Sequence, residues 1–272
     1  MRWESLIGFG LGLAGALTIA RGVANSKQLV VVRETVYIPD LPPAFEGFRL
    51  LHLTDVHLSR HHDRTDELLE HLAQVTPDLV CLGGDYVFTA LSLSVVERFL
   101  TAVSARYPTI GILGNADYRP DIGPDIKRRW ANIFPLLINA SHCVQRQADS
   151  LWFAGVNDPH KGFDDLPAAL AAVPPVVPVI LLAHSPDVIL RPLDPRIRLI
   201  LTGHTHGGQI CLPGGKALYH NTHLTAKYAA GRHEIHGATL YVSRGIGSTR
   251  LPLRYHCVPE ITVFTLTRNQ AR

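Results

Sequence analysis

The sequence predicts an α/β protein in which short buried strands alternate with amphipathic helices. Short apolar runs are separated by longer stretches with helical periodicity over the first half of the chain. Three of these runs are followed, at intervals of 30 residues, by Asp55, Asp85 and Asn115. That interval is the usual length of a β-α-β unit, whose two strands run parallel. We therefore expect these three side chains to meet at one edge of a parallel sheet.

The chain divides into a hydrophobic segment, residues 1–25, and one domain, residues 26–272. Residues 5–20 carry no charged side chain, and as a helix they would span roughly 24 Å at about 1.5 Å per residue. This length is a little short of the ~30 Å hydrocarbon core of a bilayer. Three interpretations remain open: a membrane anchor, a cleavable signal peptide, or a helix or hairpin lying on a surface.

Basic residues flank this segment unequally. Arg21, Lys27 and Arg33 follow it, whereas Arg2 precedes it. The positive-inside rule then predicts association with the inner membrane, with the domain on the cytoplasmic face. If the segment is a signal peptide instead, the domain is exported.

The first half of the domain has the pattern of alternating strands and helices. Leu68, Leu72 and Val75 form one apolar stripe at helical spacing. The expected strands cover residues 28–38, 48–53, 78–82 and 108–113, and the expected helices cover residues 65–75 and 95–105.

The second half is richer in strands, since its short apolar runs are bounded by Pro, Gly, Asn or Asp. The expected strands cover residues 134–138, 151–154, 177–182, 197–201, 239–242 and 261–266. His184 follows the third of these runs, and His204 and His206 follow the fourth. Side chains alternate along an extended chain, so two histidines two positions apart point the same way. Such a pair suits a metal ion, because imidazole is the commonest metal ligand.

Side chains of metal-binding types gather at the ends of the expected strands. The set is Asp55, His57, Asp85, Asn115, His184, His204 and His206. These seven residues are more than one ion takes from a protein, so the set suits two adjacent ions that share a carboxylate. Mixed oxygen and imidazole ligands favour Mn, Fe or Zn over Ca or Mg.

Composition and charge limit the classes of partner. The chain has 272 residues, of which 46% are hydrophobic and 18% charged, as in an ordinary globular protein. Its net charge of +3 permits anionic substrates, but the clustered basic stripe of a nucleic-acid-binding protein is missing, so we expect no nucleic acid. The four cysteines are scattered and are expected to be buried thiols rather than a disulfide framework.

The ligand-type residues stand in ordered motifs. These are Asp55-Val56-His57, Gly84-Asp85, Gly114-Asn115-Ala116-Asp117, His184 and Gly203-His204-Thr205-His206. In this order they resemble the signature of the calcineurin-like metallophosphoesterases, and most closely that of a membrane-associated bacterial branch. The resemblance covers about residues 28–268.

This resemblance implies a fold of two packed β-sheets flanked by helices, and a centre of two divalent ions. Mn is the expected metal, with Fe or Zn as alternatives. One ion would be held by Asp55, His57, Asp85 and His206, and the other by Asp85, Asn115, His184 and His204. Asp85 would bridge the ions, and Asp85 and Asn115 would be the catalytic residues. Such ions polarise a phosphate and lower the pKa of a bridging water, whose hydroxide would attack phosphorus.

One position departs from the family pattern. The family usually has a histidine after Gly-Asn, where it is thought to protonate the leaving oxygen or steady the transition state, but this chain has Ala116. Losing a general acid typically costs about 10²–10⁴-fold in rate. The loss matters least for a weakly basic leaving group, so Ala116 favours a pyrophosphate or an activated diester over ordinary phosphomonoesters. Our first hypothesis is a UDP-2,3-diacylglucosamine pyrophosphatase of lipid A synthesis, since some of these enzymes, which belong to the same superfamily, also lack this histidine.

This hypothesis implies a phosphorylated, nucleotide-linked lipid as substrate and a membrane surface as partner. Side chains expected to contact the substrate are Arg60, His61, Arg64 and Arg244, whereas Asp117 is expected only to hold a turn. Two alternatives remain. One is a broad-specificity phosphodiesterase, and the other is a metal-binding protein with impaired catalysis, for which Ala116 would be the trace of decay.

Overall fold

Two mixed β-sheets lie at the centre of the computed structural model, which describes residues 3–60, 63–123 and 125–269, with side chains from residue 15 onward. The first sheet has the strand order β1-β11-β2-β3-β4. Its strands are β1 (Val30–Tyr37), β2 (Arg49–Leu53), β3 (Leu79–Leu82), β4 (Thr109–Gly111) and β11 (Glu260–Thr267). Strands β2, β3 and β4 run parallel, as the 30-residue spacing of polar residues predicts.

The second sheet has the strand order β5-β6-β7-β8-β10-β9. Its strands are β5 (Ala140–Arg146), β6 (Asp149–Gly155), β7 (Val179–Leu182), β8 (Ile197–Thr202), β9 (Gly231–Ile235) and β10 (Ala238–Val242). Strands β6, β7, β8 and β10 are parallel to one another, and β5 and β9 close the two edges in antiparallel pairing. In both sheets, parallel strands end just before predicted metal ligands, at β2, β3 and β4 in the first and at β7 and β8 in the second.

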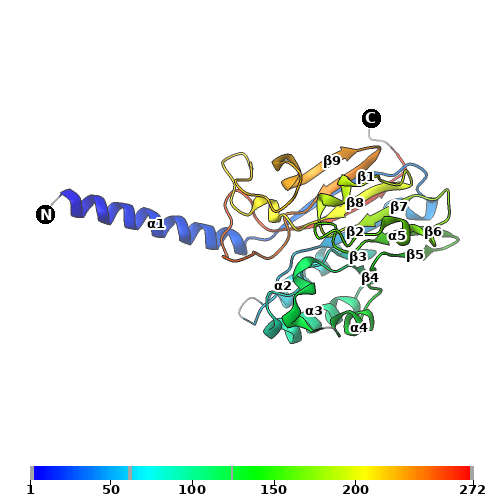
Figure 1. Cartoon of the computed structure of the whole chain (residues 1–272), viewed down its shortest axis with the longest axis horizontal. Coiled ribbons are helices and arrows are strands. Elements are labelled where there is room, and N and C mark those ends of the chain that lie inside the picture. The colour runs from blue at the N-terminus through cyan, green and yellow to red at the C-terminus, as the bar shows by residue number, and fades with distance from the viewer. Residues whose placement is uncertain (1–2, 61–62, 124, 270–272) are drawn as a thin grey trace.

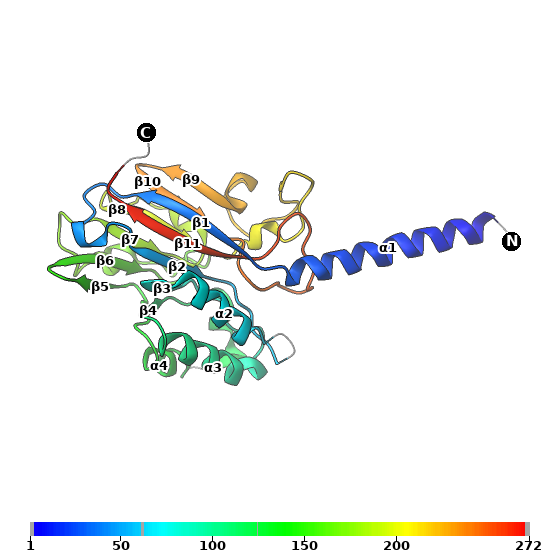
Figure 2. The ribbon, with the colours of Figure 1, turned by 180° about the vertical axis from the view of Figure 1, so that it is seen from behind.

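Helices flank the two sheets (Figures 1 and 2). Helices α2 (Thr65–Val75), α3 (Leu93–Ser104) and α4 (Ile126–Ala131) lie beside the first sheet, and the short α5 (Leu166–Leu170) lies beside the second. Along β2, Leu51 and Leu53 pack against the helices, whereas Leu50 packs between the sheets. This alternation follows from the period of two in a strand. The expected architecture of two packed sheets flanked by helices is confirmed.

Two strands at sheet edges were not predicted, and one predicted strand is wrong. Residues 134–138 form only an isolated bridge between Leu136 and Gly111, because Pro135 has no N–H to extend the ladder. The unpredicted strands β5 and β9 are half-buried edge strands, so they lack the continuous apolar run that identifies a central strand.

Residues near the N-terminus form one long helix, α1 (Trp3–Lys27), which projects away from the two sheets (Figure 1). Its last turns are bound to the loop before β11, since Arg254 N–H donates to Gly22 O (3.0 Å) and Asn25 Nδ2 donates to Arg254 O (3.1 Å). Within the described part of the chain, no helix has both the length and the apolar character needed to cross a membrane.

Candidate metal centre

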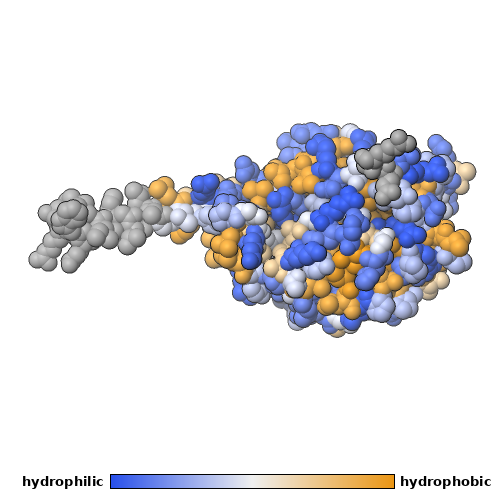
Figure 3. Space-filling view, turned by 90° about the horizontal axis from the view of Figure 1, so that it is seen from above, coloured by the Kyte–Doolittle hydropathy of each residue, from blue (hydrophilic) through white to orange (hydrophobic). Residues whose placement is uncertain are grey.

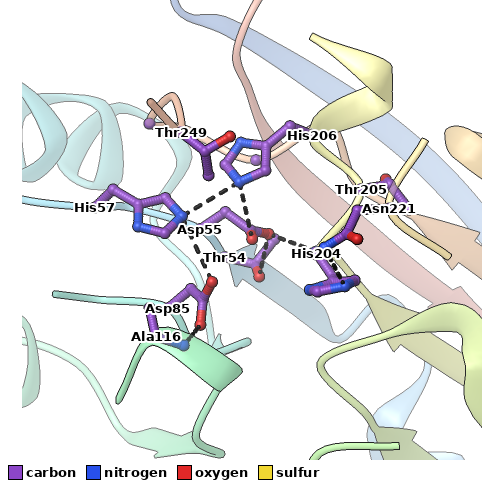
Figure 4. Close-up of polar contacts among 12 residues, drawn as sticks. Thr54, Asp55, His57, Asp85, Ala116, His204, Thr205, His206, Asn221 and Thr249 are labelled. Carbon is purple, nitrogen blue, oxygen red and sulfur yellow. Dashed lines mark hydrogen bonds and ion pairs between the residues drawn. The ribbon is translucent and has the colours of Figure 1, made fainter. Parts of the chain in front are cut away.

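All of the predicted metal ligands lie just beyond the carboxyl ends of strands. Asp55 and His57 follow β2, Asp85 follows β3, Asn115 follows β4, His184 follows β7, and His204 and His206 follow β8. Strands β2 to β4 belong to one sheet and β7 and β8 to the other, so the two sheets bring their ends together here (Figure 4). Ligands commonly bind at this end of parallel sheets.

The backbone at these residues has an unusual conformation. Five of the predicted ligands, none of them glycine, have φ between 44° and 71°: Asp55, His57, Asp85, His204 and His206. Left-handed backbone costs a non-glycine residue of order 1–2 kcal/mol, and it concentrates at functional sites. The turns that aim these side chains also need close backbone approach. A side chain at Gly203 would collide with the carboxylate of Asp55.

Asp55, His57 and His206 form a first buried triad whose ligand atoms lie within 4.8 Å of one another. The distance from His206 Nε2 to Asp55 Oδ1 is 3.4 Å, and His206 Nε2 lies 3.2 Å from His57 Nε2. Asp55 Oδ1 is buried without a hydrogen-bond partner among the described residues. The oxygen is therefore free to bind a cation.

Asp85, His184 and His204 form a second buried triad of the same kind. His184 Nε2 lies 3.4 Å from Asp85 Oδ1 and 3.2 Å from His204 Nδ1. Asn115 lines the same cavity as Asp85, and within the described structure its buried Oδ1 also has no hydrogen-bond partner. The second triad therefore has a further oxygen ligand within the same cavity.

Asp85 connects the two triads. Its Oδ1 faces His184 of the second triad at 3.4 Å, and its Oδ2 faces His57 of the first at 3.6 Å. One carboxylate thus presents one oxygen to each group, which is the arrangement that the family resemblance implies for a bridging ligand.

The donor atoms fit divalent ions in type and in spacing. Two ligands that each bind one ion at about 2.1 Å lie about 3.0 Å apart at a right angle and about 3.4 Å apart at a tetrahedral angle. Within the triads the Asp–His and His–His pairs quoted above lie 3.2–3.4 Å apart. Mixed carboxylate, amide and imidazole ligands suit Mn, Fe or Zn. The described residues therefore form two candidate sites for divalent ions.

The surroundings favour metal-binding protonation states at several of these residues. Burial, reinforced by the neighbouring His184, lowers the pKa of His204 to about 3. Burial likewise brings the pKa of His206 well below its ordinary value. Burial alone would raise the pKa of Asp85, but His184 and His57 hold it well below its ordinary range. At neutral pH, His204 and His206 are thus neutral imidazoles and Asp85 is an ionised carboxylate.

A cavity of about 470 Å³ lies above this centre. Asp85, Asn115, His204 and His206 contribute to its lining, and its other lining residues belong to two loops, residues 205–221 and 249–251. The cavity gives a substrate access to both triads.

Of the predicted substrate contacts, the three that the structure describes do not line this cavity. Arg64 pairs with Glu67 (2.6 Å), Arg244 binds Glu260 (Nε to Oε2, 2.5 Å), and Arg60 is exposed on the loop after β2. His61 lies outside the described residues. Arg250, which the sequence did not single out, lines the cavity and takes part in none of the ion pairs found among the described residues. A single arginine in an irregular loop carries no sequence signal.

Two further polar residues support the centre. Asp117 accepts hydrogen bonds from the backbone N–H groups of Asp85 (2.8 Å) and Gly114 (2.9 Å), so it holds the turn as predicted. Asn221, which was not predicted, lies with its amide 3.0 Å from His204 Nε2 (Figure 4). Asn221 stands in the loop between β8 and β9, where no periodic pattern marks it.

Comparisons with known proteins show which family and which relatives the chain is similar to. The family described as calcineurin-like phosphoesterase matches residues 48–208. The chain is 30% identical to the uncharacterized metallophosphoesterase YkuE of Bacillus subtilis (strain 168), over 95% of this chain and 94% of that protein. It is 31% identical to phosphodiesterase YaeI of Escherichia coli (strain K12), over 80% and 82% respectively. Among solved structures, TT1561 of Thermus thermophilus aligns with a TM-score of 0.47 and 13% identity, over 74% of this chain and 90% of that one.

The matched region includes every predicted metal ligand, from Asp55 to His206. It also covers more than half of the chain, and YkuE matches over nearly the whole length of both proteins. The chain therefore belongs to the calcineurin-like metallophosphoesterases, a family of hydrolases that act on phosphoester bonds.

Proposed function

We propose that this protein hydrolyses phosphodiester or pyrophosphate bonds with two divalent ions, for which Mn²⁺ is the first choice and Fe or Zn the alternatives. The position of Asp85 carries the proposal, because its two oxygens face one triad each. When bound, such ions polarise phosphate oxygens and activate a water molecule. Asp55, His57 and His206 would hold one ion, His184, His204 and Asn115 the other, and Asp85 both.

The charge balance of the centre favours a phosphate ligand. Only two of its residues, Asp55 and Asp85, are carboxylates, whereas Asn115 offers a neutral oxygen. Two divalent ions would therefore be only half neutralised by the protein. The remaining positive charge attracts an anionic substrate into the cavity.

Ala116 supports a substrate with a weakly basic leaving group. Its backbone N–H donates to Asp85 Oδ1 (2.7 Å), but its methyl group cannot protonate a leaving oxygen. An alkoxide needs that proton, whereas a departing phosphate monoester, whose second pKa is about 6, does not. A pyrophosphate or an activated diester is therefore the favoured substrate class.

Within this class, our finer proposal is UDP-2,3-diacylglucosamine, cleaved to release UMP. Apolar side chains beside the cavity support a lipid substrate. Twelve large hydrophobic side chains are exposed among the described residues, and five of them lie on the two loops around the cavity. These five are Ile210, Leu212, Leu218, Tyr219 and Leu251. Figure 3 shows hydrophobic side chains on the domain surface next to the base of α1. Arg250 on the same rim could bind a second phosphate.

The same features support a location at the inner membrane with the domain on the cytoplasmic face, an exported form being the alternative. Residues 5–20 carry no charge, and the end of their helix is bound to Arg254, close to the cavity loop of residues 249–251. An apolar N-terminal segment would then hold the cavity near the lipid phase.

The first test compares an activated diester with a matched monoester, using purified protein loaded with Mn²⁺. We expect faster diester turnover, and we expect Asp85→Ala to lower it by at least about 10²–10³-fold, as loss of a transition-state contact does. Asp121→Ala removes an exposed carboxylate paired with Arg119 and should leave the rate unchanged. Preferential monoester turnover would contradict the argument from Ala116, and metal binding without turnover would favour an impaired enzyme.

The second test supplies UDP-2,3-diacylglucosamine in detergent micelles and measures UMP. Release of UMP that requires Asp85 would support the finer proposal. A broad phosphodiesterase is the second candidate, favoured by the similarity to YaeI, which is named a phosphodiesterase. It would cleave soluble diesters without releasing UMP from the lipid.

A further inference from the structure

The metal-ligand candidate His204 is held from outside the centre by Asn221. Asn221 stands on the loop of residues 209–225, and its amide lies 3.0 Å from His204 Nε2 (Figure 4). On its other side, His204 Nδ1 lies 3.2 Å from His184 Nε2. Each nitrogen of His204 thus faces a different polar group. The nitrogen that carries the ring proton can donate a hydrogen bond, and the other can accept one or bind an ion.

The contacts of the neighbouring His184 indicate which nitrogen of His204 carries the ring proton. His184 Nδ1 lies 2.9 Å from the carbonyl oxygen of Gly83, which can only accept, so His184 carries a proton on Nδ1. When His184 binds an ion, Nε2 is therefore the nitrogen that presents a lone pair to the second triad. For His204 to bind the same ion through Nδ1, that nitrogen must also present a lone pair, which places the His204 proton on Nε2.

The geometry points to Asn221 as a positioning residue for the second ion, acting through His204. With the proton on His204 Nε2, Asn221 must accept, and a half turn of its amide brings the oxygen to that position in place of the nitrogen. Such a contact fixes both the tautomer and the ring orientation of a ligand histidine. This inference rests on the proposed two-ion function.

The loop around Asn221 is itself fastened to the segment that carries His184. Asp187, in the turn of residues 186–190, accepts hydrogen bonds from the Thr222 hydroxyl and from His223 N–H (2.9 Å). Thr222 and His223 are the next two residues after Asn221. The segment that supplies His184 therefore also fixes the backbone that presents Asn221 to His204.

Asp187 acts here as a hydrogen-bond acceptor rather than as a ligand of a third ion. His160, Asp187 and His223 also bring three possible ligand atoms within 4.8 Å of one another. However, His160 Nδ1 lies only 2.7 Å from Asp187 Oδ2, shorter than the roughly 3.0–3.4 Å between two ligands of one ion. The His160 ring also packs against His204, at 4.6 Å between ring centroids. Asp187 thus supports His204 through His160 as well as through the loop.

The experiment measures Mn²⁺ binding by equilibrium dialysis of the full-length protein, comparing Asn221→Leu with Asn221→Asp. Leu removes the acceptor, whereas Asp keeps an oxygen that can only accept. We expect two ions per wild-type chain. Asn221→Leu should keep one ion at wild-type affinity and bind the other about 10–100-fold more weakly, the usual cost of losing a contact behind a metal ligand. Asn221→Asp should retain both ions.

A matched control separates the hydrogen bond from the added charge. Tyr219→Asp places a carboxylate on the same loop, where Tyr219 is exposed and lines the cavity. Combined with Asn221→Leu, it should not restore the second ion. Wild-type affinity for both ions in Asn221→Leu, weak binding in Asn221→Asp, or restoration by Tyr219→Asp would each overturn the inference. Failure of the wild-type protein to bind two ions would instead refute the proposed function, and this inference with it.

Discussion

Two neighbouring histidines of the centre, His184 and His204, have pKa values that are shifted in opposite directions. Burial lowers the pKa of His204 to about 3, because no close carboxylate outweighs the loss of water. Burial also acts on His184, but the carboxylates of Asp85 and Asp55 outweigh it and raise the pKa of His184 to about 10. Before an ion binds, His184 therefore carries a positive charge at neutral pH, whereas His204 does not.

This difference predicts how Mn²⁺ affinity depends on pH. A divalent ion can bind the second triad only if His184 releases a proton, so affinity for that ion should rise about tenfold per pH unit while the pH stays below the raised pKa. Calorimetric titrations at about pH 7 and about pH 8, in buffers of different ionisation enthalpy, would count the released protons. A second-ion affinity that does not change with pH would show that His184 is already neutral.

At the scale of elements, Asp117 joins the carboxyl ends of β3 and β4. One of its oxygens accepts from Asp85 N–H and Gly114 N–H, and the other accepts from Tyr86 N–H (3.0 Å) and Val87 N–H (3.3 Å). These donors belong to the loops that carry Asp85 and Asn115. One buried carboxylate thus sets the spacing of two strand ends.

Asp117→Asn is expected to destabilise the fold, because its NH₂ group would face backbone donors. Each buried donor left unpaired costs about 1–3 kcal/mol, and the NH₂ group would leave two unpaired, so a loss of roughly 2–6 kcal/mol in the free energy of unfolding should follow. Urea denaturation with a chelator present would measure this loss without the contribution of bound metal. Asp121→Asn, which weakens only the exposed pair with Arg119, should change stability by less than about 1 kcal/mol.

The elements that could be predicted are those that leave a pattern in their own stretch of sequence. The 30-residue spacing of Asp55, Asp85 and Asn115 predicts β2, β3 and β4 and their parallel order, because each unit repeats one strand and one helix. The edge strands β5 and β9 could not be predicted, since partly exposed strands lack a continuous apolar run. Arg250 and Asn221 were also missed, because only the three-dimensional path of two irregular loops brings them to the cavity.

Across the whole molecule, α1 and the cavity lie at the same end. Arg254, bound to the end of α1, is buried and donates through Nη1 to Arg244 O (2.8 Å) and to His206 O (3.2 Å). A path of hydrogen bonds therefore runs from α1 to the backbone of a predicted metal ligand. The N-terminal helix can thus act on the centre in two ways. Its uncharged segment can bring the cavity to a lipid surface, and its end supports the loop that contains Arg254.

Two truncations separate these effects. Removing residues 1–20 deletes the uncharged segment but keeps Gly22 and Asn25, which bind Arg254. Turnover of a soluble activated diester should stay near the full-length rate, because the centre and its support are intact. If the uncharged segment holds the enzyme at a membrane surface, as proposed, turnover of a nucleotide-linked lipid in vesicles should fall by at least about tenfold.

Removing residues 1–25 also deletes Gly22 and Asn25, so both hydrogen bonds to Arg254 are lost. This longer truncation should additionally lower the thermal unfolding midpoint and weaken Mn²⁺ binding, since the loop that supports His206 loses its partner. Rates on soluble and vesicle-borne substrates, measured with unfolding midpoints for all three lengths, check both expectations. Equal loss of both activities in the shorter truncation would mean that the uncharged segment supports the fold rather than delivering the substrate.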